Sequence, residues 1–362
     1  MLRFSLVTLS LCFSHFAYNQ ELTIESLQLK IPQKLLCTPV RDQYMSSTCW
    51  SFASNSQIES ELLRRGKKPF DLSEMFIARY SYIHKIYQHL KLKGASFFTP
   101  GGQFHDVIWV IKNYGMMPES VYNGRGRGEK NHDHSELDTI IRRYTVKLLL
   151  QGKEAPDSLD LAYINSQLDK YLGKMPATFM YGNKTYTALT FAKKELGLNP
   201  DDYIEITSYT HHPFYKRFVL EDKYNWSLDE YYNVPLADFC RITDSALKHN
   251  YTVGWDGDAD DPYFQYESGL AYLPGRHNDF QKERQQAFED QSTLLNHMMH
   301  IVSSATDANG DKWYYIKNSW GNYSNNLGGY LFMRDDYFKI RTVAIIVNKM
   351  AIPPDIRRKL GI

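Results

Sequence analysis

Residues 43–52, which read QYMSSTCWSF, constrain the fold of this chain more than any other stretch. Ser47 or Thr48 can cap a helix that begins near Cys49, and apolar residues then recur at helical spacing until Gly66 closes the run. A thiol in the first turn of a helix lies at the positive end of the helix dipole, which favours the reactive thiolate. The stretch therefore predicts either a nucleophilic cysteine or a small buried core cysteine, and the rest of the chain has to decide between them.

Two segments near the C-terminal end supply partners for a nucleophilic thiol. His297 precedes one apolar stretch, and Asn318 follows another and opens the run NSWG. A thiol nucleophile needs a base for its proton and a third group that orients the imidazole. His297 and Asn318 suit these two roles. The side-chain amide of Gln43, in the loop before Cys49, suits an oxyanion donor together with the backbone N–H of the cysteine.

In this order, the glutamine, the Cys-Trp-x-Phe piece, the histidine and the NSWG run resemble the papain-like cysteine peptidases, and within them the bleomycin hydrolase and aminopeptidase C branch. The resemblance covers most of residues 38–347. It implies an α+β fold in two lobes, a helical lobe that carries Cys49 and an antiparallel β-sheet or barrel lobe that carries His297 and Asn318. It also implies peptide hydrolysis through an acyl-enzyme, with Trp320 shielding the contact between the asparagine and the histidine.

The resemblance also divides the chain. We expect a signal peptide over residues 1–19 and one papain-like peptidase domain over residues 20–362. Within that domain we expect a helical lobe over about 38–119, a helical insertion over about 120–250, a β lobe over about 251–349 and a short tail over 350–362.

The first residues have the pattern of an export signal. Arg3 gives a positive start, residues 4–13 form an apolar run, and residues 14–20 are mostly small or polar. The apolar run is too short for a transmembrane helix, and a first buried strand is the alternative. No second apolar span follows, so we expect no membrane span and a protein exported to the periplasm or the extracellular space.

The turn at Gly101 and Gly102 is a candidate for the wall of the substrate cleft. In the family the matching glycines line the cleft and their backbone pairs with the main chain of the substrate, where a side chain would block the approach. The alternative is a tight turn before a helix over 106–114. His105 lies beside this turn, and we expect it to cap the helix or to face solvent.

The insertion is the least informative part of the sequence. Helices are expected over residues 135–150, 159–172, 187–196, 228–239 and 243–249, with Pro235 as a break. The run 124–134 is polar and reads as a solvated loop, and so do His211 and His212. We prefer loops to a metal site at both histidine pairs, and His132 and His134 have no third ligand in view.

The C-terminal part is expected to be rich in strands. Residues 251–255, 298–304, 312–317, 328–333 and 341–347 read as strands. An antiparallel pair would place His297 beside Asn318, and His300 would point to the other face. The acidic run 256–261 can bind calcium in principle, but it lacks the EF-hand spacing and is expected to be a strand end near the cleft. We expect no metal and no cofactor.

Composition and cysteine content narrow the partners. The net charge of +1 gives no basic field for nucleic acid. The family resemblance implies a peptide or protein substrate, and a homo-oligomer is allowed. A chain of this size needs no disulfide for its stability, so Cys37 and Cys240 are expected to be free. Four Asn-x-Ser/Thr sequons, at Asn183, Asn225, Asn250 and Asn322, matter only in a eukaryotic host.

The expected function is therefore a cysteine peptidase, and more narrowly an aminopeptidase. In the related branch a C-terminal arm enters the cleft and gives aminopeptidase action, whereas residues 350–362 read as shorter than that arm. An open-cleft endopeptidase is thus the first alternative. A catalytically inactive exported binding or scaffold protein is the second.

Overall fold

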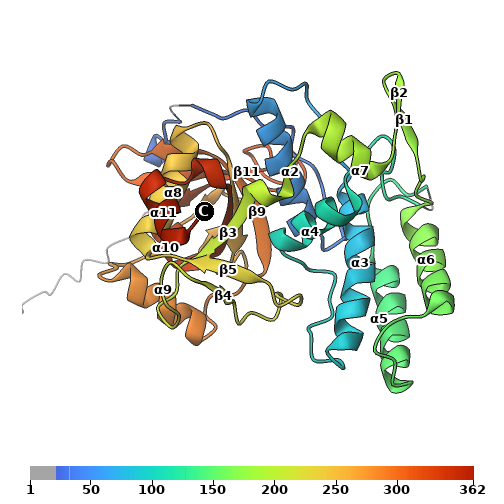
Figure 1. Cartoon of the computed structure of the whole chain (residues 1–362). Coiled ribbons are helices and arrows are strands. Elements are labelled where there is room, and N and C mark those ends of the chain that lie inside the picture. Colours follow the sequence, from blue (N-terminus) through green and yellow to red (C-terminus); the bar gives the residue numbers. More distant parts are fainter. Residues whose placement is uncertain (1–21, 32, 127) are drawn as a thin grey trace, which may run out of the picture.

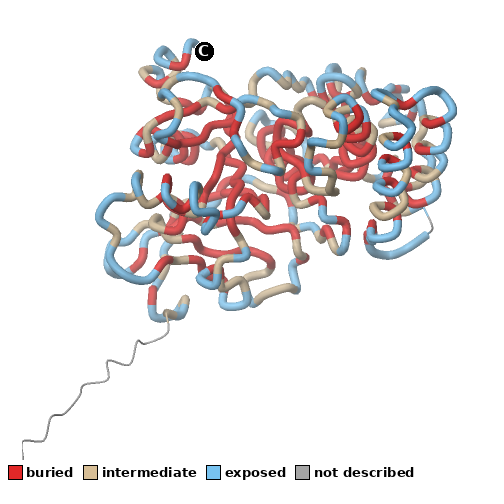
Figure 2. The backbone as a smooth tube through the Cα atoms, turned by 90° about the horizontal axis from the view of Figure 1, so that it is seen from below, coloured by how far each residue is buried: buried red, intermediate tan, exposed pale blue. Residues whose placement is uncertain are grey.

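The computed structural model describes residues 22–362 apart from residues 32 and 127, so the predicted signal peptide lies outside the described part of the chain. Figure 1 shows two lobes side by side, one built mainly of helices and one built around a twisted sheet. Buried segments run through both lobes and continue where the lobes meet (Figure 2). This arrangement confirms the predicted α+β class.

The helical lobe is organised around α2, which begins at the predicted cysteine. Its helices are α2 (Cys49–Arg64), α3 (Glu74–Lys91), α4 (Phe104–Tyr114), α5 (Ser135–Leu150), α6 (Ser158–Leu172) and α7 (Ala188–Thr190). A hairpin of β1 (Phe179–Tyr181) and β2 (Lys184–Tyr186) lies between α6 and α7, and a π-helical turn (Phe191–Leu196) follows α7. Ser73 caps α3, because its hydroxyl oxygen accepts a hydrogen bond from the backbone N–H of Phe76 at 3.0 Å.

The second lobe contains a ten-stranded sheet with the order β4-β5-β3-β12-β6-β9-β10-β11-β8-β7. The strands are β3 (Tyr203–Thr207), β4 (Arg217–Val219), β5 (Glu230–Asn233), β6 (Val253–Gly257), β7 (Phe264–Gln265), β8 (Leu270–Ala271), β9 (His297–Thr306), β10 (Lys312–Lys317), β11 (Tyr330–Arg334) and β12 (Thr342–Asn348). Two pairs, β3 with β5 and β8 with β11, are parallel and the others are antiparallel. Helices accompany this sheet at α1 (Ile24–Leu27), α8 (Leu236–Lys248), α9 (Phe280–Glu289), α10 (Asp335–Arg341) and α11 (Pro354–Leu360), with short 3₁₀ turns at Pro200–Asp202 and Lys349–Ala351.

The central strands are buried on both faces, and the alternation of their side chains separates the two cores. On β6, Val253 and Trp255 belong to the core of the β lobe. Met298 of β9 and Ile346 of β12 instead pack into the core of the helical lobe. Because successive side chains of a strand point to opposite faces, one face of β6, β9 and β12 supports the helical lobe and the other supports the β lobe.

The second half of the predicted helical insertion belongs to the sheet. The helix expected over 228–239 is wrong, because residues 230–233 form β5 and the helix begins only at Leu236. Leu228 has a positive φ of 60°, which a continuous helix does not allow. Pro235 is the N-cap of α8, a position that tolerates its missing N–H, and therefore starts a helix where the sequence predicted a break.

The residues that follow β12 pack against the β lobe. Ile356 of α11 is fully buried in the core of that lobe, and Arg241 of α8 forms an ion pair with Asp355 at 3.1 Å. Figure 1 shows the C-terminus beside α8 and α10. Residues 350–362 thus lie on the β lobe.

The predicted state of the cysteines is confirmed for the described residues, since Cys37, Cys49 and Cys240 are all free thiols. Among residues 22–362, none of the described helices combines the length and the apolar character needed to cross a bilayer.

Candidate active site

Cys49 is the first residue of α2, at the end of a loop with a strained backbone. Tyr44 and Ser47 both adopt positive φ values, 45° and 54°, which cost energy for residues other than glycine. Burial raises the pKa of the Cys49 thiol to about 11, while the backbone N–H of Met298 favours the thiolate. Burial thus acts against the helix terminus that was expected to favour the thiolate.

The amide of Met298 is also the link between Cys49 and the predicted base. Met298 follows His297, the first residue of β9, and its amide lies close enough to the sulfur of Cys49 to act on its pKa. The start of β9 therefore lies beside the N-terminus of α2. The fold thus brings Cys49 and His297 together although they lie far apart in the sequence.

His297 and Asn318 form the predicted pair. The Nε2 atom of His297 lies 2.7 Å from Oδ1 of Asn318 and donates to it, because an amide oxygen can only accept. The backbone N–H of Ser319 donates to the same oxygen at 2.8 Å and fixes the amide. This tautomer leaves Nδ1 of His297 free to accept a proton, and burial lowers the pKa of the imidazole to about 4.

Trp320 covers this pair. Its ring centroid lies 4.6 Å from that of His297 at an interplanar angle of 30°. Tyr266 packs against Trp320 in an edge-to-face arrangement, with ring centroids 4.6 Å apart. These rings lie over the side chain that pairs with Asn318, and shielding of that hydrogen bond by Trp320 stays a prediction.

Gln43 is fixed by the segment that carries the asparagine. Ser319 donates its hydroxyl hydrogen to Oε1 of Gln43 at 2.7 Å, and the backbone N–H of Gln43 donates to the carbonyl of Ser319 at 2.8 Å. Asp42 also forms a β-bridge with Trp320. Since the amide oxygen of Gln43 is occupied, its NH₂ group is the part available as an oxyanion donor.

Gly101 and Gly102 pack tightly against two aromatic rings. A Cβ atom on Gly102 would lie 2.9 Å from two ring carbons of Trp50, and one on Gly101 would lie 3.1 Å from a ring carbon of Tyr224. The indole N–H of Trp50 donates to the carbonyl of Pro100 at 3.2 Å. The residue after the nucleophile therefore holds the glycine turn in place.

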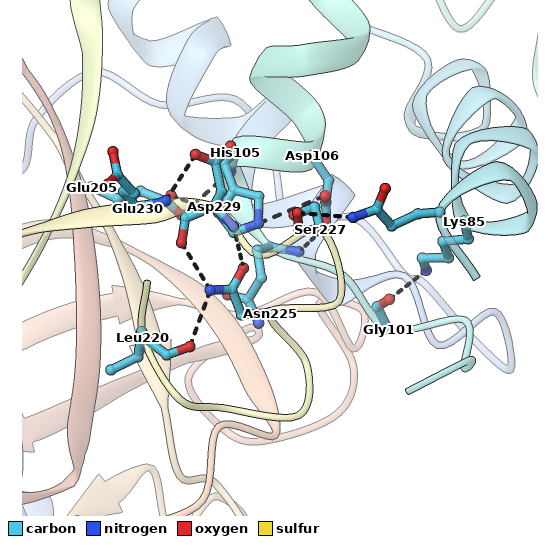
Figure 3. Close-up of polar contacts among 12 residues, drawn as sticks. Lys85, Gly101, His105, Asp106, Glu205, Leu220, Asn225, Ser227, Asp229 and Glu230 are labelled. Atoms are coloured by element: carbon cyan, nitrogen blue, oxygen red, sulfur yellow. Dashed lines mark hydrogen bonds and ion pairs between the residues drawn. The ribbon is translucent and has the colours of Figure 1, made fainter. Parts of the chain in front are cut away.

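Lys85 is a positioning residue that sequence reasoning missed. It is buried on α3, and its ammonium donates to the carbonyls of Thr99 at 3.0 Å, Pro100 at 2.9 Å and Gly101. Figure 3 shows the contact with Gly101. Burial lowers its pKa to about 8. The one signal in the sequence is that Lys85 falls, at helical spacing, among the apolar residues of the buried face of α3.

The polar loop 124–134 does not end in solvent, contrary to the prediction. His132 and His134 are both buried, and burial lowers their pKa values to about 3 and about 4. Their backbones pair with the loop before Cys49: Met45 donates to the carbonyl of His132 at 3.0 Å and accepts from the N–H of His134 at 3.2 Å. The insertion thus supports the loop that carries Gln43.

His105 does not face solvent either. Its Nδ1 lies 2.8 Å from a carboxylate oxygen of Glu205 on β3, so it forms a buried ion pair between the lobes. Burial favours the neutral imidazole, but the charges of Glu205 and Asp106 prevail and raise the pKa of His105 to about 9. It is a structural residue and lies on α4, whose first residue is Phe104.

His211 and His212 lie in a loop, as predicted. In the described part of the chain, His211, His212 and Glu221 have ligand atoms within 4.8 Å of one another, so these three side chains could hold a metal ion. His212 contacts Glu221 at 2.5 Å and His211 contacts it at 3.2 Å.

The acidic run at the end of β6 supports the segment before His297. Asp258 accepts hydrogen bonds from the backbone of Leu294 at 2.8 Å and from the side chain of Asn296 at 2.7 Å, directly before His297. Asp261 pairs with Arg341 at 2.7 Å. These carboxylates use protein donors, which agrees with the prediction of a strand end near the cleft.

Comparisons with known proteins agree with this fold. The model of the Peptidase C1-like family matches residues 15–361. Aminopeptidase C of Lactobacillus delbrueckii subsp. lactis is 24% identical over 372 residues, which cover 88% of this chain and 81% of the relative. Cysteine proteinase 1, mitochondrial, of Saccharomyces cerevisiae is 22% identical over 374 residues, covering 89% and 77%. The crystal structure of PepW from Lactobacillus rhamnosis superposes with a TM-score of 0.69 at 19% identity, covering 92% of this chain and 84% of that one.

Proposed function

This chain belongs to the Peptidase C1-like family and is a cysteine-type peptidase of papain-like fold, and on that premise we propose that it removes residues from the N-terminus of peptides through Cys49, His297 and Asn318. It lies in the aminopeptidase C and bleomycin hydrolase branch, as the sequence predicted.

One observation carries the assignment of the residues. His297 donates to Asn318 at 2.7 Å under the ring of Trp320, and this leaves Nδ1 of the imidazole free at the end of β9 that adjoins Cys49. A buried imidazole with one nitrogen fixed and the other free is what a general base for a thiol requires.

The proposed reaction is acyl transfer in two stages. The sulfur of Cys49 attacks the peptide carbonyl while Nδ1 of His297 takes the thiol proton. The resulting oxyanion accepts hydrogen bonds from the Gln43 amide and the backbone N–H of Cys49. Collapse of this intermediate breaks the C–N bond as His297 returns the proton to the leaving amine. Water, deprotonated by the same imidazole, then hydrolyses the thioester and restores the thiol.

The names of the relatives support removal of N-terminal residues, since several are called aminopeptidase C or aminopeptidase G. The endopeptidase alternative uses the same residues and differs only in where the cleft ends. An inactive binding protein would have no need of the hydrogen-bonded pair formed by His297 and Asn318.

Two fluorogenic substrates test the proposal. Leucyl-aminomethylcoumarin and its N-acetylated form should be assayed with the wild-type protein and with Cys49→Ala under reducing conditions. We expect wild-type cleavage of the free amine substrate alone and no activity in the variant. Equal cleavage of the acetylated substrate would identify an endopeptidase, and activity in Cys49→Ala would disprove the assignment of the nucleophile.

We also propose that the protein is exported by residues 1–19. The charge and the apolar run of this segment support the proposal. N-terminal sequencing of the protein from the periplasmic or extracellular fraction tests it, and the intact N-terminus in the cytosolic fraction would contradict it.

A further inference from the structure

A segment of the insertion crosses from the β lobe to the helical lobe. We call residues 220–229 the strap; they connect β4 to β5, two strands of the large sheet. Trp226 of the strap is buried and packs its ring edge-on against His84 of α3, with centroids 5.1 Å apart. Gln88 of α3 donates to the carbonyl of Ser227 at 3.3 Å. The strap is therefore anchored in both lobes.

One buried asparagine organises the strap internally. The Nδ2 group of Asn225 donates to the carbonyls of Leu220 at 3.1 Å and Asp229 at 2.9 Å, and its Oδ1 accepts from the backbone N–H of Asp229 at 3.0 Å. Figure 3 shows this side chain between the two ends of the strap, near the contact of Lys85 with Gly101. A loop tied at both ends in this way is an ordered part of the fold.

The strap reaches the wall of the cleft. Tyr224 lies so near Gly101 that a Cβ atom added there would come within 3.1 Å of its ring, and its ring meets that of Phe97 edge to face with centroids 5.3 Å apart. The ring of Tyr224 thus lies against the first of the two glycines that were expected to pair with the substrate.

A carboxyl group without a partner lies in the same region. Asp256 of β6 is fully buried, and neither of its oxygens has a hydrogen-bond partner among the described residues. It pairs in register with Met298, and cross-strand partners share a face of the sheet, so Asp256 points toward the helical lobe and the start of α2. The backbone N–H of Met298, its partner across the ladder, hydrogen-bonds the thiol of Cys49, so Asp256 lies on the strand next to the one that reaches the thiol.

The surroundings of Asp256 are acidic rather than basic. The charged groups that act on it are Asp222 of the strap and Glu205 of β3. Glu205 already has His105 as its counterion, at 2.8 Å. A buried carboxyl with no donor is costly, which makes the site receptive to a cation supplied from outside the protein.

We propose that Asp256, with Asp222 beside it, binds the α-ammonium group of the substrate while the strap closes the cleft beyond the first substrate residue. This inference rests on the aminopeptidase function proposed above and names the groups that select for a free N-terminus. An α-ammonium is the one cation that every unblocked peptide brings, whatever its sequence. Asp256 is covered in the free protein, and burial holds its carboxyl in the neutral form. The entering ammonium therefore has to displace part of the strap, and Asp256 releases its proton to solvent as the ion pair forms.

Binding to the full chain with Cys49→Ala tests the inference without turnover. The probe is the pentapeptide amide Ala-Ala-Phe-Ala-Ala, with a free or an acetylated N-terminus, titrated by calorimetry. With Asp256 intact, we expect acetylation to raise the Kd at least about 30-fold, as for the loss of one partner of a buried charge pair. After the additional change Asp256→Asn, we expect the two peptides to differ by less than about 3-fold, since the carboxylate that would pair with the ammonium is gone.

A matched control separates this effect from a general change in charge. Asp260 is exposed and lies in the same acidic run, so Asp260→Asn should retain the full preference for the free amine. Asp222→Asn keeps the oxygen that accepts from the backbone N–H of Tyr224 at 2.7 Å, and it should reduce the preference partly.

Two outcomes would overturn the inference. One is an undiminished preference for the free amine in Asp256→Asn. The other is tight binding of an acetylated peptide that carries arginine in its second position, because the carboxyl would then serve a side chain. Failure of the proposed function gives a different result: the free amine is preferred in binding, but the wild-type protein cleaves neither coumarin substrate.

Discussion

Ser319 donates its hydroxyl hydrogen to the side-chain oxygen of Gln43 across 2.7 Å, which couples the loop before the nucleophile to the segment that carries Asn318. The hydrogen bond determines which end of the Gln43 amide faces the cleft. Gln43, the proposed oxyanion donor, is therefore oriented by a hydrogen bond from a distant segment of the chain.

The first prediction concerns this pair. Gln43→Ala should lower kcat by about 10²–10³-fold, the usual cost of losing one oxyanion donor. Ser319→Ala should lower kcat by only about 10-fold, because the amide is still present but no longer fixed in one orientation. Steady-state kinetics with the coumarin substrate measures both, and a change confined to KM would contradict the role of Gln43.

The second prediction concerns the protonation of the thiol. Burial raises the pKa of Cys49 to about 11 and lowers that of His297 to about 4, so both groups are neutral between these values in the free protein. We expect alkylation of Cys49 by iodoacetamide to be slow at pH 6 and to become steadily faster up to about pH 10, as the thiolate fraction grows. The rate is measured by mass spectrometry of the peptide that contains Cys49, with Cys49→Ala for the background. A rate that is already constant below pH 6 would show a preformed ion pair instead.

The third prediction concerns the energetic cost of Asp256. Burial holds the pKa of Asp256 well above its usual range, and Asp222 and Glu205 act in the same direction. Between the unfolded and folded pKa values the folded state binds a proton that the unfolded chain has released, so this group makes stability fall as pH rises, by up to about 1.4 kcal/mol per pH unit. Asp256→Asn should remove that loss and become increasingly more stable than the wild type from pH 4 to pH 8.

Urea unfolding at pH 4, 6 and 8 measures this difference. Other buried acids with raised pKa values, such as Glu59 and Glu74, are unchanged in the variant and cancel in the comparison. Parallel stability curves for the two proteins would show that Asp256 is ionised in the folded state throughout.

The fourth prediction concerns the strap. Trp226→Ala removes the ring that anchors the strap against α3, so the strap should detach and open the closed end of the cleft. We expect cleavage of the N-acetylated substrate to appear, with a loss of stability of about 3–5 kcal/mol for a buried tryptophan. Ile356→Ala serves as the control, because Ile356 is a fully buried residue of α11 and its loss destabilises the protein without changing the strap. If Ile356→Ala gains the same cleavage of the N-acetylated substrate, the gain results from general destabilisation and not from opening of the strap.

The sequence allowed good prediction of the elements that carry the candidate site. The helix from Cys49 and the strand Lys312–Lys317 were predicted because caps and apolar periodicity are local signals. The contact between His297 and Asn318 followed from antiparallel pairing of the two strands. The resemblance to a known family supplied the roles.

The parts that were missed depend on contacts between distant segments. Residues 230–233 read as helix because the sequence contains no sign that β3 would pair with them. His105 read as exposed because its partner, Glu205, lies 100 positions later in the sequence. Asp256 read as one acid among four, and only the structure distinguishes it from Asp258, whose oxygens are occupied.

Asn225 has a consequence for how the protein can be produced. The sequence Asn225-Trp226-Ser227 is an acceptor for N-glycosylation, yet in the folded chain its amide nitrogen is buried and bound to two backbone carbonyls. A glycan attached during synthesis in a eukaryotic secretory pathway would occupy that nitrogen before the strap could form. Such an expression host would yield two populations, unmodified molecules with an ordered strap and glycosylated molecules without one. A uniform preparation therefore needs a host that does not glycosylate Asn225, such as a bacterium.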